Sequence, residues 1–248
     1  MTSEIQVVWA GRQEYVPTWE LQRELVLARR RGLIGDLLLL VEHPPTYTIG
    51  RGGSRDNLLI SEAQLEAVCA QCLDVDRGGD ITFHGPGQLV AYLIRDLGGA
   101  QRRLRHYVSQ LEETVIRTVA HYGLQAAADP RYPGVWIGRD KIAALGIAVS
   151  RGVSYHGFAL NVDPDLRYFG YMIPCGISGR GATSIARELG RPVPLEPAIE
   201  PLVVSFAESF EAEMREGLTV ADLQAIAETV RESRLADVAS GRSLGVAG

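Results

Sequence analysis

The sequence predicts an α+β (mixed α/β) fold in which helices flank a mixed, largely antiparallel sheet. Strand and helix patterns follow one another irregularly along the 248 residues, instead of in the steady alternation that builds a parallel sheet. Several apolar runs have the length of buried strands, while other segments repeat apolar residues at helical spacing. The composition, with 46% hydrophobic and 22% charged residues, is ordinary for a globular protein.

The first half of the chain alternates short apolar runs with two helix signals. Runs of strand length occur at 5–10, 36–42, 72–76 and 89–94. The segment 19–31 repeats apolar residues at helical spacing and ends in arginines, which are favourable at the C-terminal end of a helix dipole. A second helix is expected to begin at Ser61, because Gln64 three residues later completes a capping box.

In the second half, the strongest helix pattern covers 102–122 and stops before Gly123. Strand patterns follow over 135–138, 141–149 and 153–162. The remaining expectations are helical turns over 183–189, a linker over 192–197, helices over 199–214 and 220–231, and a disordered tail over 240–248.

Composition excludes several classes of function. A formal charge of −5 disfavours a nucleic-acid-binding protein, and no apolar run approaches the ~20 residues that cross a bilayer. The N-terminus lacks the basic and apolar regions of a signal peptide, and the three cysteines fit a reducing compartment, so we expect a cytoplasmic protein with no membrane partner. Cys69 and Cys72 have the spacing of half a zinc or redox site. Because the sequence offers no second pair, we expect neither a metal nor another cofactor.

The stretch 77–88 is unusually rich in glycine for a connection between two apolar runs. It reads Arg77-Gly-Gly-Asp-Ile-Thr-Phe-His-Gly-Pro-Gly-Gln88. Glycine costs conformational entropy, so this density indicates backbone that approaches a ligand or another segment closely. A long irregular connection is the alternative. Gly146 and Gly157, inside predicted strands, indicate either the same close approach or a bulge at each position.

Lys141 and Cys175 are candidate catalytic residues. Of the 25 basic residues, Lys141 is the only lysine. A lysine can lose its proton near neutral pH when its pKa is depressed, which an arginine cannot do; chance survival of a surface lysine is the alternative. Cys175 lies between a proline and a glycine. A lone cysteine is commonly a small buried hydrophobe, but a titratable amine nearby would make it a nucleophile.

Several motifs together carry a resemblance to a known family. In chain order they are Glu42-His-Pro-Pro45, Thr48-Ile-Gly50, Arg77 to Gln88, Lys141-Ile-Ala-Ala-Leu-Gly146, His156-Gly-Phe-Ala-Leu-Asn161 and Pro174-Cys-Gly176. They resemble the octanoyltransferases of lipoate synthesis, also called lipoate-protein ligase B, over about 5–189. The resemblance implies the fold of the biotin and lipoate protein ligases, which is related to the catalytic domain of class II aminoacyl-tRNA synthetases. On this basis we expect a catalytic domain over 1–216, followed over 217–248 by a C-terminal helix and the tail.

The resemblance also implies an activity, with its substrates. The enzyme would move an octanoyl group from octanoyl-acyl carrier protein to a lysine of lipoyl domains, as in 2-oxoacid dehydrogenases and the glycine cleavage system. Cys175 would carry the acyl group as a thioester, and Lys141 would accept its proton and later handle the proton of the incoming amine. By match to the family's motifs, the acyl site would be lined by Arg77, Gly78, Gly79, Asp80, Ile81, Thr82, Phe83, His84, Ala144, Leu145, Gly146, Gly157, Phe158 and Ala159. A purely structural role is equally compatible with His84.

Two rival functions fit part of the same pattern. An ATP-dependent lipoate or biotin ligase would share the lysine, but it needs no nucleophilic cysteine and typically carries a third glycine where Asp80 stands. The other rival is a non-catalytic module that only binds acylated carrier proteins. Since acyl carrier proteins are acidic, the resemblance further implies a local basic surface. Its candidates are Arg29, Arg30, Arg31, Arg51, Arg55, Arg102, Arg103 and Arg105.

Overall fold

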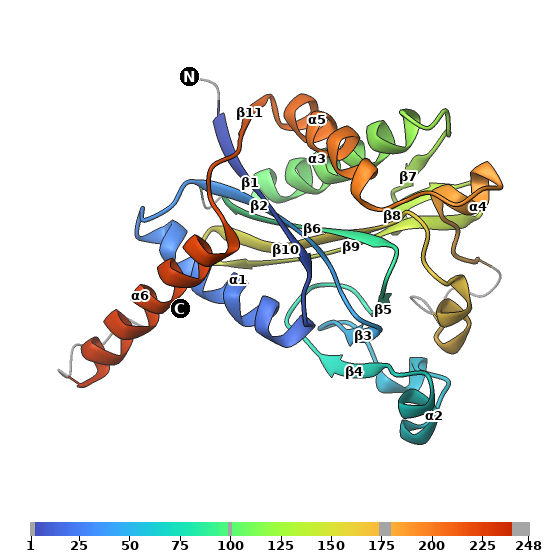
Figure 1. Cartoon of the computed structure of the whole chain (residues 1–248), viewed down its shortest axis with the longest axis horizontal. Helices are drawn as coiled ribbons and strands as arrows, with labels where there is room; N and C mark the ends of the chain where they lie inside the picture. The colour runs from blue at the N-terminus through green and yellow to red at the C-terminus, as the bar shows by residue number, and fades with distance from the viewer. Residues whose placement is uncertain (1–2, 99–100, 174–179, 240–248) are drawn as a thin grey trace.

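The described residues of the computed structural model, 3–98, 101–173 and 180–239, form an eight-stranded sheet with helices on both faces (Figure 1). From one edge to the other, its strands are β11 (Ala212–Arg215), β1 (Ser3–Arg12), β2 (Asp36–Glu42), β6 (Gln88–Asp96), β10 (Val153–Asn161), β9 (Asp140–Ser150), β8 (Tyr132–Ile137) and β7 (Ala127–Asp129). Strand β1 pairs in parallel with β11 and β2, and the other neighbouring pairs are antiparallel. The prediction of a mixed, largely antiparallel sheet is confirmed.

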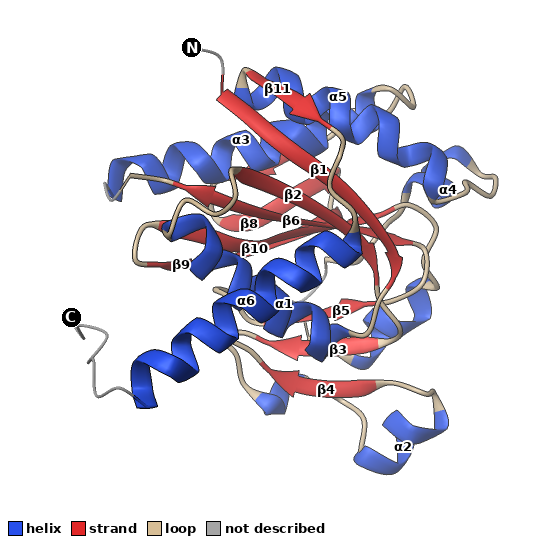
Figure 2. Cartoon of the chain, turned by 60° about the vertical axis from the view of Figure 1, so that its left-hand side comes forward, coloured by secondary structure: helices blue, strands red, loops and turns tan. Residues whose placement is uncertain are grey.

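Helices α3 (Gln101–Ala120) and α5 (Ile199–Phe210) cover one face of this sheet, while α1 (Tyr15–Arg30) and α6 (Val220–Ala239) cover the other (Figure 2). A short helix, α4 (Ile185–Leu189), matches the helical turns expected over 183–189. None of the helices in the described part of the chain is long and apolar enough to cross a bilayer.

Strand β2 is apolar along almost its whole length because both of its faces are covered. Leu38 and Leu40 belong to the core beneath α3 and α5. Their neighbours Leu37, Leu39 and Val41 belong to the core beneath α1 and α6. A central strand with both faces buried requires an unbroken apolar run, and this is the pattern that allowed the bounds 36–42 to be predicted correctly.

A smaller sheet of three strands lies beside the large one in the described part of the chain. It orders β4 (Gln71–Asp74), β3 (Thr46–Ile49) and β5 (Ile81–His84), near α2 (Glu62–Ala67) in Figure 1. Aromatic residues of the 3-10 helix η2 (Leu166–Tyr171) pack against its core. The sequence predicted a strand near β4 but assigned none to β3 or β5, because four residues carry too short a pattern to distinguish a strand from a connection.

The prediction of one helix over 199–214 is wrong at its C-terminal end. Helix α5 stops at Phe210, and Glu211 adopts a left-handed conformation with φ of 48°. The chain then turns back as β11, whose backbone pairs with β1 at the edge of the sheet. That pairing partner lies some two hundred residues away, so no local pattern could reveal it.

Two other helix bounds differ from expectation. Helix α1 begins at Tyr15 and not at residue 19, because Pro17 falls in the first turn, where its missing N–H needs no partner. Helix α6 continues beyond 231 to Ala239. The tail 240–248 lies outside the described residues, so its predicted disorder stays a prediction.

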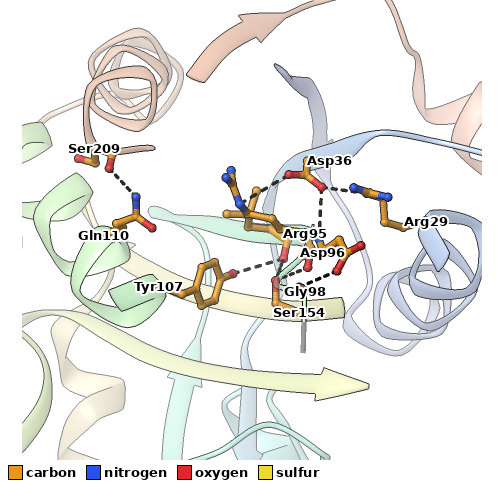
Figure 3. Close-up of polar contacts among 10 residues, drawn as sticks. Arg29, Asp36, Arg95, Asp96, Gly98, Tyr107, Gln110, Ser154 and Ser209 are labelled. Carbon is orange, nitrogen blue, oxygen red and sulfur yellow. Dashed lines mark hydrogen bonds and ion pairs between the residues drawn. The ribbon is translucent and has the colours of Figure 1, made fainter. Parts of the chain in front are cut away.

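Asp36 ties helix α1 to the sheet (Figure 3). Its Oδ1 accepts a hydrogen bond from Arg29 Nε at 2.8 Å, and its Oδ2 lies 3.6 Å from Arg95 Nε. On the other face, Gln110 Nε2 donates to the backbone oxygen of Ser209 at 2.9 Å and joins α3 to α5. Arg29, a candidate for the basic carrier surface, is therefore engaged within the fold.

Candidate functional site

A cavity of about 670 Å³ lies between the small sheet and strands β6, β9 and β10 of the large one. Small and apolar residues of β9 and β10 form one wall, and η2 contributes Leu166 and Phe169. The glycine-rich stretch 77–88, the segment 141–146 and the segment 156–161 all contribute to its lining. Three motifs that are far apart in the sequence therefore meet around one cavity.

Most of the predicted acyl-site residues line this cavity. They are Arg77, Gly79, Asp80, Ile81, Thr82, His84, Ala144, Leu145, Gly146, Gly157, Phe158 and Ala159, and Lys141 joins them. Gly78 and Phe83 do not. Phe83 is buried in the core of the small sheet, stacked on Tyr168 with ring centroids 4.6 Å apart. Successive side chains of a strand point to opposite faces, so Phe83 faces away from the cavity side of Thr82 and His84. Ile81, which belongs to the same small-sheet core as Phe83, still reaches the cavity lining. Gly78 instead donates its N–H to the backbone oxygen of Ile147 at 2.8 Å.

Gly146 and Gly157 face each other across β9 and β10, and both mark close approaches. A Cβ atom at Gly157 would lie 2.1 Å from the carbonyl oxygen of Ala91. At Gly146 it would lie 2.8 Å from Arg77 Cδ. Of the two alternatives at these positions, close approach explains both glycines, since β9 and β10 stay in register through them.

Arg77 is buried and fastens the glycine-rich loop to the small sheet. Its Nε and Nη2 donate to Thr48 Oγ1 at 3.1 and 2.9 Å, and its Nη1 donates to the carbonyl oxygen of Gly78 at 2.9 Å. Thr48 Oγ1 also lies 3.4 Å from His84 Nε2. Burial, with His43 and Arg77 nearby, holds the pKa of His84 well below its usual value, so His84 is neutral at neutral pH.

His43 forms a buried hydrogen-bonded pair with Tyr92, which lines the cavity. The carbonyl oxygen of Gln13 can only accept, so His43 Nδ1 donates to it at 2.7 Å. His43 Nε2 is then the acceptor for the Tyr92 hydroxyl at 2.8 Å. Burial lowers the pKa of His43 to about 4, which keeps this tautomer neutral.

Asp76 gathers three donors at the edge of the cavity. Trp19 Nε1, the Tyr155 hydroxyl and His156 Nε2 lie 2.8, 2.6 and 2.9 Å from its carboxylate oxygens. Burial opposes ionisation of Asp76, but these hydrogen bonds hold its pKa below the usual value. Burial lowers the pKa of His156 although the contact with Asp76 opposes this shift. A neutral His156 therefore donates to an ionised Asp76. The backbone of His156 is left-handed, with φ of 57°.

Lys141 is the second residue of β9, and its backbone pairs on both sides with the chain at 181–183. Its backbone N–H donates to Gly181 at 2.9 Å, and its carbonyl oxygen accepts from Thr183 at 3.0 Å. Its Nζ lies 4.7 Å from the centroid of the Trp136 ring, and the Arg180 guanidinium lies 4.6 Å from the same centroid. A cation near an aromatic face is attracted to the ring, so the Trp136 ring is a shared neighbour of the two basic side chains.

Cys175, the candidate nucleophile, lies outside the described residues. The nearest described cavity residues on either side of it are Met172 and Arg180. The backbone pairing of Lys141 with Gly181 and Thr183 also brings the chain after the cysteine motif to the candidate base.

Comparison with known proteins agrees with this architecture. The model of the lipoyl protein ligase A/B catalytic domain matches residues 14–207. The chain belongs to this family. An octanoyltransferase of Rubrobacter xylanophilus is 50% identical over 201 residues, which are 80% of this chain and 90% of that protein. An octanoyltransferase of Myxococcus xanthus is 44% identical over 215 residues, but the match spans only 60% of that longer protein. These relatives confirm the predicted transferase class of enzyme.

Solved structures confirm the predicted lipoyl protein ligase fold. A lipoate-protein ligase A with bound ATP has a TM-score of 0.70 at 15% identity, over 94% of this chain and 95% of that one. The lipoate protein ligase of an archaeal lipoylation system from Thermoplasma acidophilum has a TM-score of 0.71 at 15% identity, over 93% and 92% of the two chains. At this identity the likeness concerns the fold alone.

The candidate site contains residues that the sequence analysis did not predict. Asp76 directly precedes the Arg77 motif, and its role depends on donors from α1 and β10. Trp136 pairs with Lys141 in the β8–β9 hairpin. Because both strands were predicted with a short connection, their pairing register was the one signal that could have identified Trp136.

Proposed function

We propose that this enzyme transfers an octanoyl group from octanoyl-acyl carrier protein to a lysine of lipoyl domains, through a thioester on Cys175. This would be the first step of endogenous protein lipoylation, with 2-oxoacid dehydrogenases and the glycine cleavage system as acceptors. The observation that carries the proposal is that Lys141, the only lysine in the sequence, lines a cavity whose β9 and β10 wall is small and apolar. The octanoyltransferase relatives support the acyl group that we assign to it.

In the first half-reaction, the sulfur of Cys175 attacks the carbonyl carbon of the carrier thioester. Lys141 accepts the thiol proton, and the carrier leaves as its own thiol after that proton is returned to it. In the second half-reaction, the ε-amine of the acceptor attacks the enzyme thioester, an amide forms, and the Cys175 thiol is restored. Two transfers at an activated carbonyl replace one slow transfer, which is the advantage of covalent catalysis.

The acyl chain would lie along Ala144, Leu145 and Gly146 of β9 and their partners in β10. Burial of a hydrocarbon stabilises the bound state by about 0.8 kcal/mol for each methylene group. The paired glycines Gly146 and Gly157 leave that wall without side chains at its centre. This supports a flat wall for an unbranched chain, while the space that side chains would fill at the two glycines is occupied by Arg77 and by the carbonyl oxygen of Ala91.

Mass spectrometry of the enzyme after incubation with octanoyl carrier tests the covalent step. We expect a mass increase of one octanoyl group on Cys175, removable by hydroxylamine and absent from Cys175→Ala. Cys69→Ala is the matched control, because Cys69 is the exposed cysteine among the described residues. A label that stays on Cys175→Ala, or that maps to Cys69 or Cys72, contradicts the assignment.

Nucleotide dependence distinguishes the proposed transferase from the rival ATP-dependent ligase. The carrier thioester is already activated, so transfer should survive complete removal of nucleotide. Activity that requires ATP and free octanoate would identify a ligase instead.

We also propose that residues 1–216 form the catalytic domain, which β11 completes at the sheet edge. Residues 217–248 would add α6 and the tail. The enzyme would act in the cytoplasm.

A further inference from the structure

A second cavity, of about 520 Å³, lies on the α1 and α6 face of the molecule and is unusually rich in arginine. We call it the arginine groove, and its arginines are Arg23, Arg30, Arg31, Arg51, Arg151 and Arg234. They come from helix α1, the loop after β3, the β9–β10 turn and helix α6. The only acidic residue of the groove's described lining is Asp76, whose carboxylate already accepts from Trp19, Tyr155 and His156.

Much of the positive charge in the arginine groove is left uncompensated by the fold. Arg30, Arg51 and Arg151 are exposed, and none of them forms an ion pair with an acidic residue that the structure describes. By contrast, Arg29 and Arg55, two other candidates for a basic surface, pair with Asp36 and Asp74 at 2.8 and 2.6 Å. A concentrated basic surface on a chain with a net charge of −5 is a site for an acidic partner.

The arginine groove adjoins the acyl cavity but not its Lys141 end. Arg51 lines the groove, and the next residue, Gly52, lines the cavity. Asp76 of the groove contacts His156, which also lines the cavity. Lys141 stands at the start of β9 and Arg151 just after its end, so about ten residues of extended strand, roughly 30 Å, separate them.

This separation distinguishes the two protein substrates of the proposed function. The acceptor lysine must itself reach the acyl group, so the acceptor domain has to contact the surface beside Lys141. A carrier protein presents its acyl group on a long flexible arm, so its body can contact the enzyme away from the reacting atoms. We propose that the arginine groove is the docking surface for the acidic face of the acyl carrier protein, an inference that rests on the proposed function.

The test compares charge reversal in the groove with the same change elsewhere. Arg30→Glu and Arg151→Asp, singly and together, remove groove charge; aspartate is chosen at 151 because it tolerates the left-handed φ of 49° there. Arg191→Glu is the matched control, an exposed arginine near Tyr122 at the α3 and α5 face of the sheet. Circular dichroism and thermal unfolding establish that each variant folds.

We expect the double variant to raise the KM for octanoyl carrier about tenfold, with kcat and the acceptor KM unchanged, since exposed interface charges act mainly on encounter. The KM for S-octanoyl-N-acetylcysteamine, a neutral thioester without a protein body, should stay at the wild-type value. Raised salt should bring the wild-type carrier KM towards that of the double variant.

An unchanged carrier KM, or an equal rise with the small thioester, overturns the docking proposal. A rise confined to the acceptor KM assigns the groove to the lipoyl domain and overturns it as well. Direct binding of fluorescently labelled carrier to wild type and double variant, followed by anisotropy, keeps the two proposals separate. If no acyl transfer is observed with wild type, the proposed function fails, and the binding comparison still decides whether the groove docks the carrier.

Discussion

Gly146 lies directly opposite Gly157 across β9 and β10, and neither position has room for a methyl group. The obstacles are of different kinds. At Gly157 the nearest atom is the backbone oxygen of Ala91, 2.1 Å from an added Cβ. At Gly146 the nearest atoms are a side-chain carbon of Arg77 at 2.8 Å and the backbone oxygen of Gly78 at 3.0 Å. A backbone oxygen inside a sheet cannot move without breaking the ladder, whereas Arg77 and Gly78 belong to a loop.

Gly157→Ala should mainly reduce stability. Its methyl group would separate β10 from β6, so the free energy of unfolding should fall by about 1–3 kcal/mol or more, the usual range for overpacking. Urea unfolding of the variant measures this loss. Gly35→Ala is the control, since nothing lies within 4 Å of a Cβ there. Equal stability of the Gly157 and Gly35 variants would show that β10 can move away from β6 at no cost in free energy.

Gly146→Ala should mainly reduce catalysis. The methyl group displaces Arg77, which lines the cavity and is held there by Thr48 and the backbone oxygen of Gly78. We expect kcat/KM for the acyl donor to fall by about tenfold or more, since small misplacements at a reacting site are costly, with less loss of stability than in Gly157→Ala. Steady-state kinetics and urea unfolding on the same preparation separate the effects. A variant with wild-type kcat/KM would remove Arg77 from the acyl site.

Lys141→Arg should fold normally and lose most of its activity. Arginine keeps the positive charge above Trp136 but cannot accept a proton at neutral pH. Loss of a general base typically costs a factor of about 10² to 10⁴, and the transfer to the acceptor amine should suffer more than the acylation of Cys175. Single-turnover measurements of each half-reaction, with circular dichroism as the folding control, check this. Wild-type turnover would return Lys141 to a structural role.

Stability should decline with acid below about pH 6.5. Burial lowers the pKa of His43 to about 4 and also lowers that of His84 and His156 from an ordinary value of 6.5. Between about pH 4 and pH 6.5 the unfolded chain binds more protons than the folded one. The free energy of unfolding therefore falls as the pH drops through this range. Each histidine contributes up to about 1.4 kcal/mol per pH unit.

Urea unfolding at pH 7, 6 and 5 measures this dependence directly. His43→Gln should make the slope shallower by about one proton, because the glutamine does not titrate. A slope that His43→Gln leaves unchanged would mean that this histidine is protonated in the folded state.

Glu211→Gly should stabilise the fold. Glu211 ends α5 with φ of 48°, where a side chain costs free energy and glycine does not. Relief of the left-handed conformation gains about 1–2 kcal/mol, and the added chain entropy of glycine offsets about 0.5–1 kcal/mol of it. We therefore expect the free energy of unfolding to rise by about 0.5–1 kcal/mol. Glu211→Ala serves as the control and should show no such gain, because alanine retains the Cβ. Thermal and urea unfolding of both variants are the measurements, and equal stability of the two would contradict the argument.

Much of the large sheet could be predicted because its strands are covered on both faces. The run over 36–42 and the run over 153–161, where every residue of β10 is buried, carry burial directly in their composition. Strands β3 and β5 could not be predicted in this way, since four residues show no decisive period and their hydrogen bonds come from each other. Strand β11 was mistaken for helix because its pairing with β1 is invisible in local sequence.

For the site, the sequence by itself determined the candidate residues. The single lysine, the glycine clusters and the cysteine motif are properties of residue type and order, and together they indicate the octanoyltransferases. Tertiary structure alone decided where the described candidates lie and what they contact. Strand alternation turned Phe83 away from the cavity, hairpin register placed Trp136 beside Lys141, and packing of α1 against β10 brought Trp19 to Asp76. Each outcome depends on which distant segments touch, and contacts of that kind arise only when burial and backbone pairing are satisfied for the whole chain at once.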